Sequence, residues 1–391
     1  MSALALGRRA LSLLALLAPI VASQLALAAK PDDPAQYPEQ LAALRRFVAC
    51  DARVTDAKLP EGVTQRWIDG ACKTVTRRIA DYRKRWLDRA EPFLRGLVPA
   101  NIPETVVYPF GGADLLTALI VYPKAKTITT MSLEWVGDPR AIATMNAATF
   151  QKSVKSHHAF LMKLFWVNHN RTVDLQALNH SPIPAPLVFA LTALELLGFE
   201  PLEARWFRLA DDGKVVYVTE ADVTAYDADK GKKQVERNQF FANVELRFKK
   251  AGDPAAPVQT WRHMRANLQD DNLRGTPVQK YLESQGTIAG ITKAASYLIW
   301  RDDFSVIRSY MLDHMTWMIS ESSGILPFHA EPKGFVQETW GRFVGSLFGG
   351  SAKGQRAMRE LFAKSPDKKL DFFFGYPDTG QNRHLLVTRK P

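Results

Sequence analysis

The chain has 391 residues, of which 46% are hydrophobic, 10% aromatic and 23% charged. This is the composition of a folded globular protein, and it excludes a collagen-like, disulfide-dense or intrinsically disordered chain. Lys and Arg outnumber Asp and Glu by 51 to 40, which gives a formal net charge of +11. Only the first thirty residues contain an apolar run that could be considered as a membrane segment, so the sequence excludes a polytopic membrane protein.

The N-terminus has the three parts of a secretory signal peptide. They are a positive pair (Arg8 and Arg9), an apolar core (residues 10–22) and a small-x-small cleavage site (Ala26 to Ala28). We expect cleavage after Ala28, which gives a periplasmic or secreted protein and lowers the formal net charge from +11 to +9. A membrane anchor is the alternative, but a spanning helix needs about 20 apolar residues and this core has about 13. The arginine pair leaves twin-arginine export open beside general secretion.

Residues 29–102 are predicted to form a helical segment with one disulfide. The chain has two cysteines, Cys50 and Cys72, and in an oxidising compartment such a pair is typically joined. A catalytic or free thiol is the alternative, but neither cysteine lies in a CxxC motif or has a histidine near it in the sequence. We therefore expect a disulfide between the helix before Cys50 and the helix that follows Gly62.

The most basic part of this segment runs from Lys73 to Arg95. Its apolar residues recur at helical spacing on one stripe, and arginines and lysines lie off that stripe. The simpler interpretation is a helix with a solvated charged side. The alternative is contact with an anionic membrane surface or cell-wall polymer. Nucleic acid is not an expected partner, because the charge is not concentrated enough and an exported protein seldom meets it.

A βαβ unit begins after Pro103. An apolar β-rich run at 105–110, a glycine turn, a helical stretch at 113–122 and a second β-rich run at 127–133 follow one another. Strands and helices then interleave to the C-terminus. We therefore predict that residues 103–391 form a Rossmann-like α/β domain with a mixed sheet, similar to class I methyltransferases.

The later elements are predicted from periodicity and capping residues. Thr276 is expected to cap the helix that ends at Gly286, and Asp303 the helix that runs to residue 320. The other predicted helices cover 156–167 and 186–197, and the predicted strands cover 214–226, 241–250, 258–268, 293–300 and two runs around a hairpin turn at 377–380.

The βαβ unit supplies the candidate ligand site. Gly111 and Gly112 form a turn after the first strand, and Glu134 lies 22 residues after Gly112, where an acid can bind ribose hydroxyls. The turn lacks the third glycine of GxGxxG, and Asp114 would place negative charge beside a pyrophosphate, so a dinucleotide is disfavoured. The looser methyltransferase pattern fits better. We place Tyr108 with these four residues at the rim of the crevice.

We expect no cofactor and no metal. S-adenosylmethionine and nicotinamide cofactors are not expected outside the cytoplasm. His158, His169 and His180 recur every 11 residues, but 11 helical residues rise about 16 Å, too far for one zinc site. The acidic pairs at 270–271 and 302–303 border predicted turns or helix starts, so we expect them to cap helices and not to act as acid and base.

The chain resembles a family of uncharacterised exported bacterial proteins. Members carry a Y-P-F-x-G-x-D turn, a G-L-E-P-V-G strand end and an A-S-Y-L-x-x-R-x-x-F-S-x-I-R block, which correspond here to residues 108–114, 132–137 and 295–308. This chain has Ser132 and Trp135 where the family has Gly and Pro, and it diverges after Trp340. The resemblance implies export and a shared fold from about Pro103 onward, and it implies no activity.

The sequence favours an exported, non-catalytic protein that binds a small ligand or has a structural role in the envelope. One alternative is an envelope hydrolase or transferase whose acids, such as Asp114 and Glu134, converge in one pocket. The other is a protein that binds anionic surfaces through its basic helix.

Overall fold

The structure is a computed structural model. It describes residues 32–167, 178, 181–229, 231, 233, 236, 239–293, 295–343, 351–364, 368–374 and 383–391. The signal peptide expected at residues 1–28, His169, His180 and the hairpin turn expected at 377–380 lie outside the described residues. Within the described residues, no helix is both long enough and apolar enough to cross a membrane.

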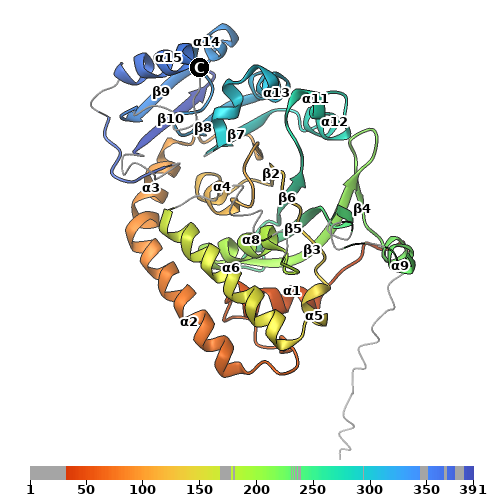
Figure 1. Cartoon of the computed structure of the whole chain (residues 1–391). Coiled ribbons are helices and arrows are strands. Elements are labelled where there is room, and N and C mark those ends of the chain that lie inside the picture. The colour runs from red at the N-terminus through yellow and green to blue at the C-terminus, as the bar shows by residue number, and fades with distance from the viewer. Residues whose placement is uncertain are drawn as a thin grey trace, which may run out of the picture.

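The fold is built on one ten-stranded mixed sheet with the strand order β4-β3-β5-β6-β2-β1-β7-β8-β10-β9 (Figure 1). The strands are β1 Thr105–Tyr108, β2 Thr127–Ser132, β3 Phe199–Leu209, β4 Val215–Tyr217, β5 Asn243–Lys250, β6 Gln259–Arg265, β7 Ile288–Thr292, β8 Met315–Ser320, β9 Val336–Gly341 and β10 His384–Arg389. The five central strands, β6-β2-β1-β7-β8, are all parallel. The flanking pairs are antiparallel.

The predicted βαβ unit is confirmed. β1 pairs in parallel with β2, with Thr105 opposite Thr127 and Tyr108 opposite Thr130, and α4 (Leu115–Val121) connects them. On the other side of the parallel core, the last strand, β10, lies antiparallel between β8 and β9. The strand order, with parallel central strands and helical crossovers, confirms the predicted Rossmann-like α/β fold with a mixed sheet.

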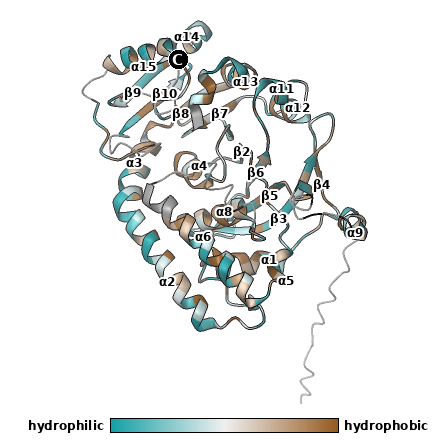
Figure 2. Cartoon of the chain, in the orientation of Figure 1, coloured by the Kyte–Doolittle hydropathy of each residue, from teal (hydrophilic) through white to brown (hydrophobic). Residues whose placement is uncertain are grey.

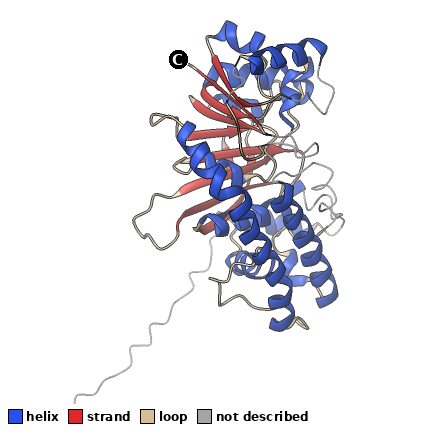
Figure 3. Ribbon diagram, turned by 90° about the vertical axis from the view of Figure 1, so that its left-hand side faces the viewer, coloured by secondary structure: helices blue, strands red, loops and turns tan. Residues whose placement is uncertain are grey.

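The helices cover both faces of the sheet, which Figure 3 shows as one continuous twisted layer. Besides α4, they are α1 Pro38–Ala43, α2 Gln65–Tyr82, α3 Asp88–Leu97, α5 Ala141–Thr144, α6 Ala147–Val167, α8 Ala185–Leu197, α9 Glu220–Ala228, α11 Asp270–Leu273, α12 Pro277–Glu283, α13 Ser305–His314, α14 Pro327–Ala330 and α15 Ala352–Ala363. Successive strand residues point to opposite faces. Val106 accordingly belongs to the core shared with α2, α4, α6 and α8, and Val107 to the core shared with α12 and α13.

The N-terminal helices pack into the same core as the sheet. α2 and α3 are joined by a π-helical segment, Arg83–Leu87, and the buried side chains include Val75 on α2 and Trp86 on the π-helical segment. Cys50 and Cys72 form the predicted disulfide, with a Cα–Cα distance of 5.4 Å. Figure 2 shows α2 as largely hydrophilic along the edge of the molecule, because its apolar stripe is turned inward.

Several strand predictions were wrong or incomplete, and β3 and β9 were not predicted. In the run 214–226, only Val215–Tyr217 is a strand, because Thr219 and Asp222 form a capping box that starts α9. Within the run 293–300, Ala295–Trp300 is a short 3₁₀ segment, and the strand lies before the run, at β7. The pairing of β3 with β5 shifts register between Pro201 and Glu203.

The C-terminal part also differs from prediction. The expected helix to residue 320 ends at His314, and β8 follows without a break. Asp303 does not cap α13, since its carboxylate pairs with Arg301. Asp270, from the loop after β6, instead accepts hydrogen bonds from the backbone N–H of Val306 and the hydroxyl of Ser305. β10 pairs with β9 and β8, and the first run of the predicted hairpin, at 370–374, is not a strand.

Candidate functional site

The glycine turn after β1 folds back on the last residue of that strand. A Cβ on Gly111 would lie 2.5 Å from Cγ of Tyr108, so only glycine fits against this ring. Gly112 has a φ of +52°, and Phe110 has a φ of +59°, which is unusual for an aromatic residue. The backbone that would approach a ligand in a nucleotide-binding fold is therefore packed against the Tyr108 side chain.

Asp114 is the N-cap of α4 and one half of a buried ion pair. Its carboxylate accepts hydrogen bonds from the backbone N–H of Thr117 (3.1 Å) and the hydroxyl of Tyr108 (3.1 Å). The ammonium of Lys293, which directly follows β7, lies 2.8 Å from the same carboxylate and donates to the hydroxyl of Thr117 (2.7 Å). The Lys293 side chain is 2% exposed and that of Asp114 is 11% exposed.

This ion pair lies at the topological switch point of the sheet. From β1 the chain proceeds to β2 and β6 on one side, and it later returns to β7 and β8 on the other. In open α/β sheets, ligands bind outside the carboxyl ends of the strands at this point. Here Asp114 comes from the loop after β1 and Lys293 from the loop after β7, and the two meet each other there.

Glu134 lies at the end of β2 in a separate set of contacts. It is 2% exposed, and in the described part of the chain one of its carboxylate oxygens, Oε1, has no hydrogen-bond partner. Burial raises the pKa of this carboxyl group above its usual value, and Ser132 and Arg265 oppose that shift. No hydrogen bond between described residues links the carboxylates of Glu134 and Asp114.

His263 on β6 joins the Glu134 loop to the sheet. Trp261 Nε1 donates to Thr130 Oγ1 (3.1 Å), and this hydroxyl lies 3.2 Å from His263 Nδ1. His263 Nε2 lies 3.1 Å from the Glu134 carbonyl oxygen. A neutral ring with its hydrogen on Nε2 donates to the Glu134 carbonyl oxygen and accepts the Thr130 hydroxyl at Nδ1. The Gly112 carbonyl oxygen, 3.1 Å from Nδ1, then receives no hydrogen from the ring. Complete burial lowers the pKa of His263 to about 4, which keeps the ring neutral.

A further polar cluster lies where β8 ends and β10 begins. The Ser323 hydroxyl donates to the carboxylate of Glu321, and His384 Nδ1 accepts the backbone N–H of Ser322. In a serine hydrolase, the serine hydroxyl donates to the histidine, and the acid holds the other ring nitrogen. Here the serine hydroxyl donates to the acid, and the ring nitrogen Nδ1 accepts from the main chain and lies 3.9 Å from Glu321 Oε2.

The five predicted rim residues thus fall into two groups. Tyr108, Gly111 and Asp114 contact one another, whereas the carbonyl oxygens of Glu134 and Gly112 lie beside His263, 3.1 Å from Nε2 and 3.1 Å from Nδ1. Lys293 and His263 were not among the predicted site residues. A lone lysine after a strand and a lone histidine within one carry no motif, so only the pairing of the strands identifies them.

Two surface cavities lie away from these residues. One of about 550 Å³ lies between α1, residues 56–60 and α5. The other, of about 680 Å³, lies beside Tyr226 and Phe240. Neither is lined by a residue of the glycine turn, by the ion pair or by Glu134, so neither supports the predicted crevice site.

Comparisons with known proteins do not assign a family. A scan of protein-family models, a search of curated proteins and a search of solved structures each find no match. The resemblance to exported bacterial proteins therefore stays a prediction.

Proposed function

We propose that this chain is an exported envelope protein in which a methyltransferase-like sheet serves as a scaffold without a nucleoside cofactor, and that it acts by binding and not by catalysis. The disulfide is compatible with an oxidising compartment outside the cytoplasm. The leader at residues 1–28 supports export on sequence grounds.

The observation that carries this proposal is the buried Asp114–Lys293 ion pair at the switch point. A cofactor in a Rossmann-like fold needs a bare glycine backbone and free polar groups at this position. Here the Tyr108 ring lies against Gly111. The charges of Asp114 and Lys293 are paired with each other, and the Asp114 carboxylate also caps α4. A ligand would have to separate a buried ion pair before it could bind.

Calorimetry with S-adenosylhomocysteine and NAD as probes tests the proposal. We expect no saturable heat and no change in the unfolding temperature at millimolar probe concentrations. A ligand at 100 times its Kd would stabilise the protein by about 2.7 kcal/mol, which raises the unfolding temperature by several degrees. A saturable binding curve for either probe, accompanied by such a rise, would contradict the proposal.

A second candidate function, docking on an anionic envelope surface, is favoured by the outer side of α2. Arg66, Lys73 and Arg77 are exposed, and their spacing of seven and four residues places them on one side of the helix. Lys84 continues the row, which extends about 27 Å from Arg66. We call these four residues the basic row. Because the apolar stripe of α2 is buried in the core, the contact would be electrostatic, without insertion into lipid.

Co-sedimentation with anionic phospholipid vesicles tests this candidate. Each basic residue near such a surface contributes about 1 kcal/mol at moderate salt. Reversal of Arg66, Lys73 and Arg77 to Glu is expected to abolish binding that the unmodified protein shows at low salt. A matched control reverses Lys124, Lys364 and Lys369, which are exposed and lie on other elements. Equal losses in the two variants would show a response to net charge alone and would exclude a docking role for the basic row.

A further inference from the structure

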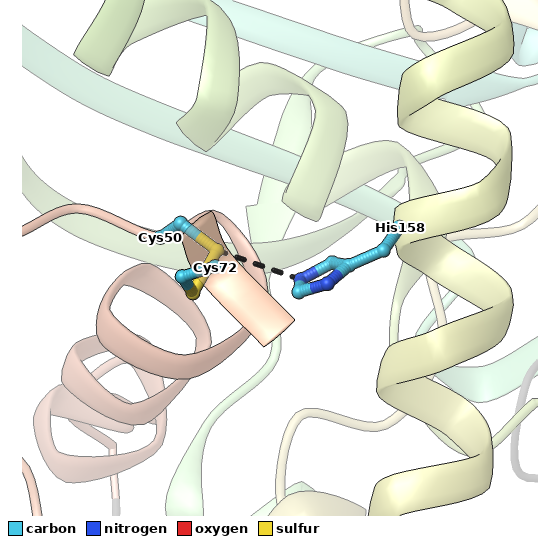
Figure 4. A group of neighbouring side chains, drawn as sticks. All are labelled: Cys50, Cys72 and His158. Atoms are coloured by element: carbon cyan, nitrogen blue, oxygen red, sulfur yellow. Dashed lines mark hydrogen bonds between the residues drawn. A yellow bond between two sulfur atoms is a disulfide. The ribbon is translucent and has the colours of Figure 1, made fainter. Parts of the chain in front are cut away.

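The disulfide has a histidine beside it that comes from a distant part of the sequence. Cys50 follows the π-helical segment Leu44–Val48, Cys72 lies on α2 and His158 on α6. Nε2 of His158 lies 3.5 Å from Sγ of Cys50, and the three ligand atoms lie within 4.8 Å of one another (Figure 4). All three side chains are buried.

The separation of the Cys50 sulfur and the His158 nitrogen matches a tetrahedral zinc site, and the Cys72 sulfur lies within 4.8 Å of both atoms. With Zn–S bonds of about 2.3 Å and Zn–N bonds of about 2.0–2.1 Å, adjacent sulfur and nitrogen ligands lie about 3.5 Å apart. Cys50 Sγ and His158 Nε2 already have this separation. The two sulfurs, bonded at 2.07 Å, would have to move to about 3.8 Å. Rotation about the cysteine side-chain bonds can supply that change.

We propose that Cys50, Cys72 and His158 form a Zn²⁺ site in the chain whose disulfide is reduced. A dithiol reductant supplies two electrons by thiol–disulfide exchange, so that the protein disulfide becomes two thiols and the reductant becomes a disulfide. Zn²⁺ then binds as the two thiols release their protons to solvent, which leaves two thiolate ligands and one imidazole. The oxidised chain has no thiolate and does not form the site.

The surroundings hold the ligands in place without the disulfide. Asp51, next to Cys50, is buried and bonded to Arg45 (2.9 Å) and Arg53 (2.8 Å), which fixes the loop. The carbonyl oxygen of Val48 lies 2.9 Å from His158 Nε2 and 3.8 Å from Cys50 Sγ. A tetrahedral zinc site has four ligands, and the Val48 carbonyl oxygen lies beside the place of the fourth ligand. Binding requires the Nε2 proton to move to Nδ1.

The site would join the same elements as the disulfide and add α6. The metal would therefore hold the Cys50 loop and α2 together in a chain that has not been oxidised. Metal binding would allow the unoxidised protein to reach the same fold, because the free energy of metal binding contributes to folding.

Titration of the full chain with Co²⁺, a spectroscopic substitute for Zn²⁺, tests the proposal. After reduction with a phosphine and removal of excess reagent, one Co²⁺ per chain is expected to bind, with thiolate charge-transfer bands and the strong visible bands of tetrahedral Co²⁺. Zn²⁺ should displace it. The oxidised protein should show neither set of bands.

His158→Gln is the deciding variant, because Gln can still donate to the Val48 carbonyl but is a poor zinc ligand. Loss of an outer-shell partner already weakens metal affinity by about 10–100-fold, so loss of this ligand should cost at least as much. Equal Co²⁺ affinity in the reduced parent and His158→Gln proteins would overturn the proposal, as would the absence of binding in the folded, reduced parent. If reduction unfolds the chain, Zn²⁺ is expected to restore the native circular dichroism, and failure to do so would also overturn it.

Discussion

Replacement of Lys293 by Met is expected to lower the free energy of unfolding by about 3–5 kcal/mol, because it leaves the largely buried carboxylate of Asp114 without its cation. The Lys293 hydrogen bond to Thr117 is lost in the same variant. Equilibrium unfolding in urea measures the change. The slope with urea should stay the same if the fold is retained.

The matched variants are Asp114→Asn and the double variant. Asn can still cap α4, so Asp114→Asn chiefly removes the charge and leaves Lys293 unpaired. Combining it with Lys293→Met removes both charges. We expect the double variant to be clearly more stable than the sum of the two single losses predicts. Additive losses, or a loss below about 1 kcal/mol for Lys293→Met, would show that the pair does not hold the switch point together.

A loss of stability between about pH 6.5 and pH 4 is the second large effect, and it arises from the buried histidines. Burial lowers the pKa of His263 and of His157 from 6.5 to about 4. Between these values the unfolded chain binds protons that the folded chain does not. Stability is therefore complete above about pH 6.5 and declines as the pH falls toward 4. A difference of about 2.5 pKa units corresponds to about 3 kcal/mol per histidine.

The variant His263→Gln isolates this effect. Glu134 and Glu195 have raised pKa values and act in the opposite direction, since the folded chain takes up their protons first as the pH falls. The test therefore compares the loss of unfolding free energy with pH between variants, and does not rely on the pH dependence of the parent protein alone. Urea unfolding at pH 7 and pH 4 should show a loss about 3 kcal/mol smaller for His263→Gln than for the parent. His157→Gln should behave similarly, and unchanged losses in both would contradict the assignment.

The fold was predictable where local signals and tertiary structure agree. The βαβ unit combines apolar runs at 105–110 and 127–133 with a glycine turn, and parallel pairing follows from the intervening helix. Where the signals conflict, prediction failed. Met315 begins β8 directly after α13, with no Gly or Pro to mark the change. β3 contains Pro201, and a proline in an apolar run argues against a strand.

The candidate site was predictable only in part, for a similar reason. Tyr108, Gly111 and Asp114 lie within seven residues, so their proximity follows from one turn. Lys293 lies 176 residues after Thr117, and it reaches Asp114 because β7 pairs beside β1. The sequence could place Asp114 at the crevice but could not show that a lysine from another loop meets it there. The environment of His158 beside Cys50 is likewise visible only after α6 packs on α2.

The central claim, that side chains of this protein occupy its own switch point, is tested most directly by amine labelling of the native protein. A short pulse of an acylating reagent, followed by peptide mass spectrometry, gives the relative reactivity of each lysine. Lys58 and Lys214, whose side chains are more than 80% exposed, serve as internal standards. We predict that Lys293 stays essentially unlabelled until the protein is unfolded. Labelling of Lys293 at the rate of the two standards would show an open crevice and would contradict the account.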